Sequence, residues 1–341
     1  MSAFVETASE PARIAGEVDL LVAGDAVPDV IVGDVEGEIA YGQTETLVER
    51  GTLTVGGSSG IMACGAARLG LRVAFVGVFG DDAAGRFMLE ELTTRGVDVS
   101  GCVVLPKRAT GLTVNLVRSG PERDRALLTS LGCVDELTAA MVRRACGEGV
   151  RHLHVGSFYL LAKLAPGLAG LFAEARLAGR TTSLDTQSDW AGRWQGGLRE
   201  VLRETDLYFP NRDEALAVAA SLGPEPTAGA DLDEALETLA ALGPLPVVKC
   251  GAEGAITRGG EGVVRIAAPH MTPIDTIGAG DSFDAGFLYG HLQGWPIART
   301  LALAVACGSL STRAAGGVDA QPELAEALAT SLGAAEGSQP L

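Results

Sequence analysis

The stretch that decides the fold is DTIGAGDSFDAGF, residues 275–287, which places three glycines and three aspartates just before an apolar, helix-like run. A merely flexible loop does not need the carboxylates, and a solvated acidic patch does not need the glycines. A glycine-rich turn that leads into a helix exposes backbone N–H groups at the positive end of the helix dipole, which suits phosphate oxygens. We therefore expect Gly278, Ala279 and Gly280 to form an anion-binding cradle.

Asp281 lies where this helix should begin, and two roles are open to it. An aspartate at a helix start commonly caps the helix by accepting a backbone N–H. Beside a bound phosphate, a carboxylate can instead take the proton of an attacking hydroxyl, as happens in phosphoryl transfer. The neighbouring cradle favours the second role.

Composition limits the classes of protein to consider. With 341 residues and 47% hydrophobic content, the chain can bury the core of one large α/β domain or of two smaller ones. The net charge of −17 argues against a binder of nucleic-acid backbones. The N-terminus lacks the pattern of a secretory signal, and the apolar runs are too short or too interrupted to span a bilayer, so we expect a cytoplasmic protein without membrane partners.

Short apolar runs alternate with helix-like segments along most of the chain. The predicted strands cover residues 18–24, 72–78, 152–158, 181–185, 206–210 and 245–251. This alternation predicts a mainly parallel sheet with helices on both faces. Residues 30–55 and 101–131 instead show strand-like alternation without an intervening helix, so we expect them to pair as a small projecting sheet.

Other phosphate-binding motifs are absent from the sequence. No GxxxxGK[ST] occurs, and no predicted strand is followed by GxGxxG at the start of a helix. The signature set of the protein kinases is also missing. The cradle at 278–280 therefore belongs to neither a P-loop nor a dinucleotide-binding fold.

Several segments together resemble the ribokinase-like (PfkB) carbohydrate kinases. In family order they are 56–70 (GGSSGIMACGAARLG), 110–117 (TGLTVNLV), 210–214 (PNRDE), 249–254 (KCGAEG) and 275–287. The resemblance implies a three-layer α/β/α sandwich with a mainly parallel central sheet and a small β-sheet lid. We expect this kinase domain to span 16–325, with 1–15 and 332–341 as loose tails. It also implies transfer of the γ-phosphate of ATP, bound with Mg²⁺, to a hydroxyl of a sugar or sugar-like molecule.

The resemblance also assigns site residues. Asp281 matches the catalytic base, and 278–280 match the anion hole. Asp29 matches an aspartate that binds acceptor hydroxyls. The residues that match the lid hinge, the nucleotide site and the magnesium-organising NxxE motif are Gly56, Gly57, Asn211, Glu214, Lys249, Gly251 and Gly254. For Lys249, approach to a phosphate and exposure as a solvated surface lysine are equally compatible with the sequence.

Two departures from the family affect the acceptor site. Ile61 stands where the family usually has an asparagine that reaches the acceptor, and Val27 aligns with a second polar position. Ser58 could supply a hydroxyl instead, although a serine after two glycines also suits a helix cap. An acceptor with an apolar or deoxygenated face is therefore expected, and ribose and fructose are expected to be poor substrates.

Some expectations concern ions and partners. Related kinases hold potassium at the position of Asp275, here with Ile277 and carbonyls of 311–317, although Asp275 could equally brace the loop. The partner is expected to be a small molecule and not a nucleic acid, and a homodimer through the lid is a further expectation. Two alternatives stay open, a nucleoside kinase and a non-catalytic ligand-binding or regulatory member. The intact carboxylate and cradle argue against the latter.

Overall fold

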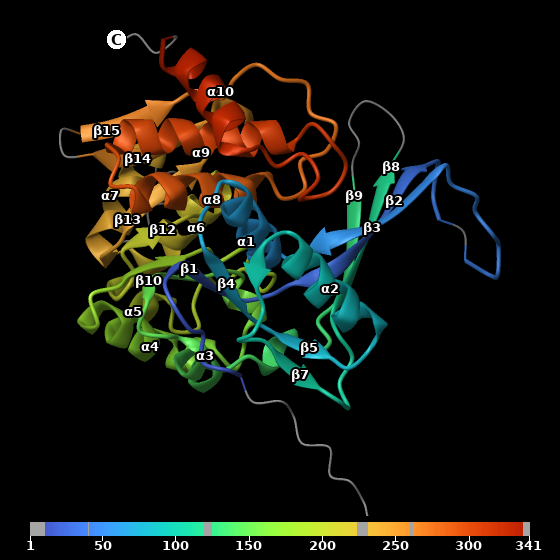
Figure 1. Ribbon diagram of the computed structural model, residues 1–341. Coiled ribbons are helices and arrows are strands. Elements are labelled where there is room, and N and C mark those ends of the chain that lie inside the picture. The colour runs from blue at the N-terminus through green and yellow to red at the C-terminus, as the bar shows by residue number, and fades with distance from the viewer. Residues whose placement is uncertain (1–10, 40, 119–124, 224–230, 260–261, 337–341) are drawn as a thin grey trace, which may run out of the picture.

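The computed structural model describes residues 11–39, 41–118, 125–223, 231–259 and 262–336 (Figure 1). Its main sheet has nine strands in the order β15-β14-β13-β12-β11-β10-β1-β4-β6. The strands are β1 Val18–Ala23, β4 Val73–Val76, β6 Val97–Asp98, β10 Val150–Val155, β11 Thr181–Leu184, β12 Leu207–Tyr208, β13 Leu245–Lys249, β14 Ala255–Gly259 and β15 Gly262–Ile266. Pairing is parallel from β13 to β6, and β14 and β15 add an antiparallel edge.

Helices cover both faces of this sheet, because its central strands are apolar on both sides. In β1, Leu21 and Ala23 belong to one core, whereas Leu20 and Val22 belong to the other. The first core is closed by α3 Ala139–Ala145, α4 Ala165–Leu177, α5 Leu198–Arg203, α6 Arg212–Leu222 and α7 Leu232–Leu242. The second is closed by α1 Ser58–Arg68, α2 Ala83–Thr94, α8 Ala279–Leu292, α9 Ile297–Ser311 and α10 Leu324–Glu336. The predicted three-layer arrangement is therefore present.

A separate four-stranded sheet projects from one side of the main body (Figure 1). Its order is β3-β2-β8-β9, with β2 Val27–Val35, β3 Arg50–Gly56, β8 Leu112–Arg118 and β9 Arg125–Ser130. The region 101–131 is divided between two places, because β7 Val103–Leu105 pairs with β5 Val78–Gly80 and does not join the small sheet. Only the later part of that region contributes strands to the small sheet.

The two predicted tails are shorter than the sequence suggested. Ile14 is buried, and its N–H donates to the carbonyl of Ala145 at 2.9 Å, so residues 11–15 are held against the body and the loose assignment is wrong there. At the other end, α10 continues through Glu336, past the predicted limit of 332. The remaining tail residues, 1–10 and 337–341, lie outside the described chain. Within the described ranges, no helix is both long and apolar enough to cross a membrane.

The topology gathers polar residues at one edge of the main sheet. Strands β1, β10, β11 and β13 are parallel, and their carboxyl ends lie at the same edge. Asp25, Ser157 and Asp185 follow three of these strands closely, and Lys249 ends the fourth. This is the edge at which ligands bind in open α/β sheets.

Candidate active site

The predicted anion cradle is the start of α8. Gly278 precedes the helix in the left-handed region, with φ of 72°. A Cβ on Gly278 would lie 2.7 Å from the Cα of Gly317 and 2.9 Å from Cγ2 of Ile61, so a side chain cannot fit. The N–H of Ala279 donates to the Thr276 carbonyl at 3.3 Å.

The next two N–H groups of the cradle are free. Within the described chain, those of Gly280 and Asp281 have no protein acceptor. Such unpaired groups at a helix start are what an anion hole requires.

Two cavities meet at this helix start. The cavity under the small sheet, here called the small-sheet cavity, measures about 220 Å³ and reaches Ile277, Gly278 and Asp281. The second, here called the α9 cavity, measures about 380 Å³ and reaches Ala279 and Gly280 from the other side. The α9 cavity also contains three residues predicted for the nucleotide site, namely Lys249, Gly251 and Gly254. The cradle is thus a wall shared by both cavities.

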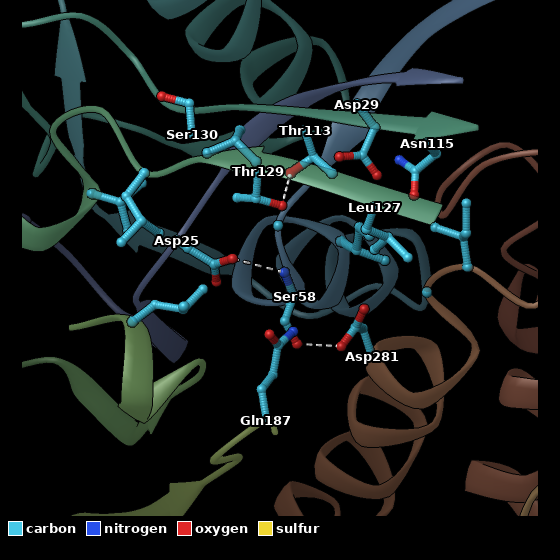
Figure 2. A pocket seen from close by; sticks show the side chains of 18 of the residues that line it. Asp25, Asp29, Ser58, Thr113, Asn115, Leu127, Thr129, Ser130, Gln187 and Asp281 are labelled. Atoms are coloured by element: carbon cyan, nitrogen blue, oxygen red, sulfur yellow. Dashed lines mark hydrogen bonds between the residues drawn. The ribbon is translucent and has the colours of Figure 1, made fainter. Parts of the chain in front are cut away.

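Asp281 faces the small-sheet cavity with an unusual pKa. Burial and the nearby Asp185 carboxylate raise the pKa of Asp281 to about 7, while the hydroxyl of Ser58 and the ammonium of Lys249 act in the opposite direction. Ser58 donates its Oγ hydrogen to the Asp281 carboxylate, as Figure 2 shows. A carboxyl group that titrates near neutral pH can accept and release a proton under ordinary conditions. Ser58, predicted to reach the acceptor, thus also orients Asp281.

Asp25 is a site residue that the sequence interpretation missed. Its carboxylate accepts hydrogen bonds from the backbone N–H groups of Ser58 and Ser59 at 3.2 Å each, from Ser59 Oγ at 3.0 Å and from Ser157 Oγ at 2.7 Å. It therefore fixes the first turn of α1 against the end of β10. Its position directly after the predicted strand 18–24 was the available signal, since polar residues gather at such strand ends.

Asp29 lies where the resemblance suggested, on β2 and in the wall of the small-sheet cavity. It packs directly on the backbone of Gly56, because a Cβ there would lie 2.1 Å from the Asp29 Oδ1. Burial, and secondarily the charge of Asp25, raises the pKa of Asp29 to about 7. Gly57 follows and directly precedes α1. Gly56 therefore makes room for the Asp29 carboxylate, in addition to any hinge role of the di-glycine.

The wall of the small-sheet cavity also contains residues that sequence reasoning did not single out. They are Thr113, Asn115, Arg125, Leu127, Thr129, Ser130 and Gln187, most of them on β8 and β9. Val27 and Ile61 line the same cavity, as expected. Ile61 is only 3% exposed, because it packs beneath Gly278 and Gly317. The small-sheet cavity is thus apolar at Ile61 and Val27 and mostly polar along β8 and β9.

Lys249 is not a solvated surface lysine. Its side chain is largely buried, with Nζ 2.8 Å from Asp185 Oδ2 and 3.2 Å from Asp284 Oδ2. Burial alone would lower the lysine pKa, but these two carboxylates outweigh it and hold the pKa above its usual range. Carboxylate oxygens of Asp185, Asp281 and Asp284 lie within 4.8 Å of one another. Lys249 supplies a cation between two of them.

The NxxE motif forms a complete helix cap. Asn211 Oδ1 accepts from the Glu214 N–H, and Glu214 Oε2 accepts from the Asn211 N–H, each at 2.9 Å. This reciprocal pair is a capping box, which requires the same spacing as the magnesium motif. Glu214 Oε1 makes only a long contact, 3.4 Å, with Ser188 Oγ. Burial and the charge of Asp185 raise the pKa of Glu214.

Asp275 braces the loop before α8. Its Oδ1 accepts from the N–H of Ile277 and its Oδ2 from the N–H of Gly316, both at 3.0 Å. Arg125 Nη1 lies 3.5 Å from the same Oδ1. Both carboxylate oxygens are therefore already used by protein donors.

Comparison with known proteins agrees with this geometry. The chain belongs to the pfkB family of carbohydrate kinases, whose family model matches residues 19–324. The 2-dehydro-3-deoxygluconokinase of Bacillus subtilis is 28% identical over 276 residues, covering 78% of this chain and 83% of the relative. The acarbose 7(IV)-phosphotransferase of Actinoplanes sp. is 30% identical over 313 residues, covering 88% of this chain and 95% of the relative.

A solved structure shows the same fold. A ribokinase II-type protein of Escherichia coli, in complex with ATP and Mg²⁺, matches with a TM-score of 0.78 at 20% identity, covering 92% of this chain and 98% of that chain. The prediction of a ribokinase-like three-layer sandwich with a small separate sheet is confirmed. With the family match and the named relatives, the chain is a carbohydrate kinase.

Proposed function

We propose that the enzyme transfers the γ-phosphate of MgATP from the α9 cavity to a hydroxyl of a sugar-like acceptor in the small-sheet cavity, with Asp281 as general base. The observation that carries this proposal is the start of α8, which separates the two cavities. Asp281 faces the small-sheet side, and the unpaired N–H groups lie at the boundary. A phosphoryl group passing between the cavities would cross at this point.

Each group at the boundary has a definite chemical task. The acceptor O–H gives its proton to the Asp281 carboxylate as the oxygen attacks phosphorus, and the O–P bond to ADP breaks. Ser58 holds the receiving carboxylate in place. The N–H groups of Gly280 and Asp281 stabilise the charge on the transferring phosphoryl oxygens. Positioning and electrostatics of this kind supply most of the catalysis in phosphoryl transfer.

Magnesium would enter with ATP and offset the charge of the phosphates. Such ions are usually held through waters and one or two carboxylates. Glu214 fits this role, because its Oε1 has only a long protein contact. Asp185 is committed to Lys249, so Glu214 is the carboxylate that we propose for a magnesium-bound water.

The acceptor is proposed to be a sugar or sugar acid with a deoxygenated carbon. Ile61 and Val27 offer no hydrogen bond on one side of the small-sheet cavity, so a hydroxyl buried against them would be unpaired. The name of the Bacillus subtilis relative specifies a deoxy sugar acid, in line with such a surface. A nucleoside would use the same apolar wall for its base and remains the alternative.

The test is an ADP-release assay with purified enzyme, MgATP and single candidate acceptors: D-ribose, D-fructose, 2-dehydro-3-deoxygluconate, a polyol series and nucleosides. We expect ADP release that depends on an acceptor and is strongest with a deoxy sugar acid. Release with nucleosides alone would favour the alternative. Normal ATP binding without acceptor-dependent release for any compound would contradict the kinase proposal.

Potassium is not required by the contacts of Asp275. Its two oxygens already accept backbone N–H groups and face Arg125, which fits a loop brace better than an ion ligand. We expect equal rates in potassium and in tetramethylammonium at matched ionic strength. A clear rate increase with potassium alone would restore the cation site.

We also propose a homodimer through the small sheet. On the face opposite the cavity, paired positions place Leu53, Val30, Val114 and Leu128 in one row across the four strands. Leu53 is 52% exposed and Leu128 is 61% exposed. An apolar row on the outer face of a sheet is a suitable contact for a second copy.

A further inference from the structure

Gln187 is a polar residue of the small-sheet cavity that belongs to the main body and not to the small sheet. It follows β11 and lines the cavity together with Ser58 and Asp281. Figure 2 shows its side chain pointing toward these two residues from the side opposite the small sheet. In the part of the chain that the structure describes, its side-chain amide makes no hydrogen bond to protein. The two N–H donors of the amide are therefore available to a ligand.

The backbone holds Gln187 in an unusual conformation. Its φ is 52°, in the left-handed region that residues other than glycine seldom adopt. The Gln187 N–H donates to Asp185 Oδ1 at 2.9 Å. The hydroxyl of Thr186, just before Gln187, shares a hydrogen bond of 3.1 Å with that of Tyr208. Asp185 and Thr186 are both buried, so the surrounding fold imposes the direction of the Gln187 side chain, as is common at functional sites.

The contacts around Gln187 place it at the boundary between the two cavities. Asp185 holds the Gln187 N–H with Oδ1, while its Oδ2 lies 2.8 Å from Lys249 Nζ. Lys249 lines the α9 cavity, whereas Gln187 lines the small-sheet cavity. The residue after Gln187, Ser188, makes the long contact with Glu214. Gln187 is thus connected to Lys249 and Glu214, the residues expected near the phosphates, while its own side chain lies on the acceptor side.

We infer that Gln187 is a further catalytic residue, whose Nε2 donates a hydrogen bond to an oxygen of the phosphoryl group as that group passes between the cavities. The inference rests on the proposed function of the two cavities. The transferring phosphoryl group spreads its charge over three oxygens, and donors fixed in advance around them lower the barrier. Gln187 adds a side-chain donor from the β11 side to the backbone N–H groups of Gly280 and Asp281 on α8.

A neutral donor suits this position, because the position lies close to the base. A lysine or arginine here would pair with the Asp281 carboxylate, lower its pKa and make it a weaker base. A carboxylate here would repel the phosphoryl group. An amide donates to the phosphoryl oxygens without either effect.

The first test needs no acceptor. The full-length enzyme is titrated with ADP, Mg²⁺ and aluminium fluoride, which together mimic the transferring phosphoryl group bound to ADP. Gln187→Leu keeps roughly the size of the side chain and removes both N–H donors. It is expected to bind this complex about ten- to a hundredfold more weakly than the wild type, with equal affinity for MgADP alone. Gln187→Glu, of equal size and without an N–H donor, is expected to lose at least as much.

Gln43→Leu is the matched control. Gln43 is also a glutamine in the left-handed region, with φ of 64°, but it is exposed in the loop between β2 and β3. This variant should bind the fluoride complex as the wild type does. Equal affinity in the wild type and both Gln187 variants, including the case in which none of them binds the complex more tightly than MgADP, would overturn the inference.

The second test measures kcat and KM by ADP release with D-ribose, D-fructose and 2-dehydro-3-deoxygluconate. For the acceptor used best by the wild type, Gln187→Leu is expected to lose about ten- to a hundredfold in kcat, with KM within about threefold. A raised KM with unchanged kcat would show that Gln187 binds the acceptor and would overturn the inference. Absence of activity in the wild type would contradict the proposed function instead, and the fluoride titration would still decide the role of Gln187.

Discussion

Ser58→Ala removes the hydroxyl that donates to the Asp281 carboxylate, and its effect can be worked out from the structure. Hydrogen bonds to charged groups are worth about 1.5–3 kcal/mol, which corresponds to a rise of about one to two units in the pKa of Asp281. The wild-type pKa is about 7, so half of the enzyme is ionised at pH 7. After the rise, only about one part in ten to one in a hundred is ionised, and kcat/KM at pH 7 should fall about five- to fiftyfold.

The direction of the shift in the pH profile distinguishes a raised Asp281 pKa from a general loss of activity. Because the base must be ionised, a higher pKa moves the rising limb of the pH profile to higher pH, and about half or more of the activity should return near pH 9. The assay is kcat/KM by ADP release from pH 5.5 to 9.5. Ser59→Ala is the matched control, since Ser59 Oγ donates to Asp25 and not to Asp281. A Ser58→Ala profile lowered equally at all pH values, with its limb unmoved, would refute the reasoning.

Three further predictions follow from packing and burial. Leu128→Lys, on the outer face of the small sheet, should convert a dimer to a monomer in light scattering. Leu177→Lys, at a position 90% exposed on α4, is the control and should leave the dimer intact. An unchanged dimer in Leu128→Lys would rule out the outer face of the small sheet as the dimer contact. Gly278→Ala should abolish activity, because the new Cβ would lie 2.7 Å from the Cα of Gly317. Gly170→Ala is the control and should retain activity, because a Cβ there meets nothing within 4 Å. Substantial activity in Gly278→Ala would contradict the packing argument. Burial lowers the pKa of His154 to about 4. The neutral imidazole therefore contributes about 3 kcal/mol to the free energy of unfolding, a contribution that is complete above about pH 6.5 and is lost as the pH falls toward 4. Urea unfolding from pH 7 to 4.5 should therefore show a weaker pH dependence in His154→Gln, and equal slopes would show that His154 does not titrate in this way.

Local patterns in the sequence predicted the main sheet and the cradle. Apart from Asp19, the run at 18–23 is apolar, which favoured a strand covered on both faces, and GAG before an apolar helix-like run favoured a tight helix start. The division of 101–131 between two sheets was not predictable. β7 is only three residues long and pairs with β5, and the strand-like alternation of the sequence does not show whether β7 pairs with β5 or joins the small sheet as β8 does.

The side-chain partners were less accessible because they lie far apart in sequence. Lys249 meets Asp185 and Asp284 only after three segments fold together, so its burial had no local signal. The NxxE spacing serves both a capping box and a magnesium motif, and sequence alone gives no choice between them. Asn115 could be placed on a strand, but its position beside Asp29 in the cavity wall is a property of the folded chain.

The central claim is that Asp281 takes the proton of the acceptor hydroxyl, and the rate of phosphoryl transfer in a single turnover tests it most directly. Asp281→Asn keeps the size of the side chain and can still accept from Ser58, but it cannot accept the proton. With the acceptor that the wild type uses best, the rate in Asp281→Asn should fall by about two to four orders of magnitude, while the Kd for MgATP and the Tm show no loss. A variant that binds MgATP normally and retains more than about a third of the wild-type rate, with chemistry rate-limiting, would contradict the assignment of Asp281 as the base.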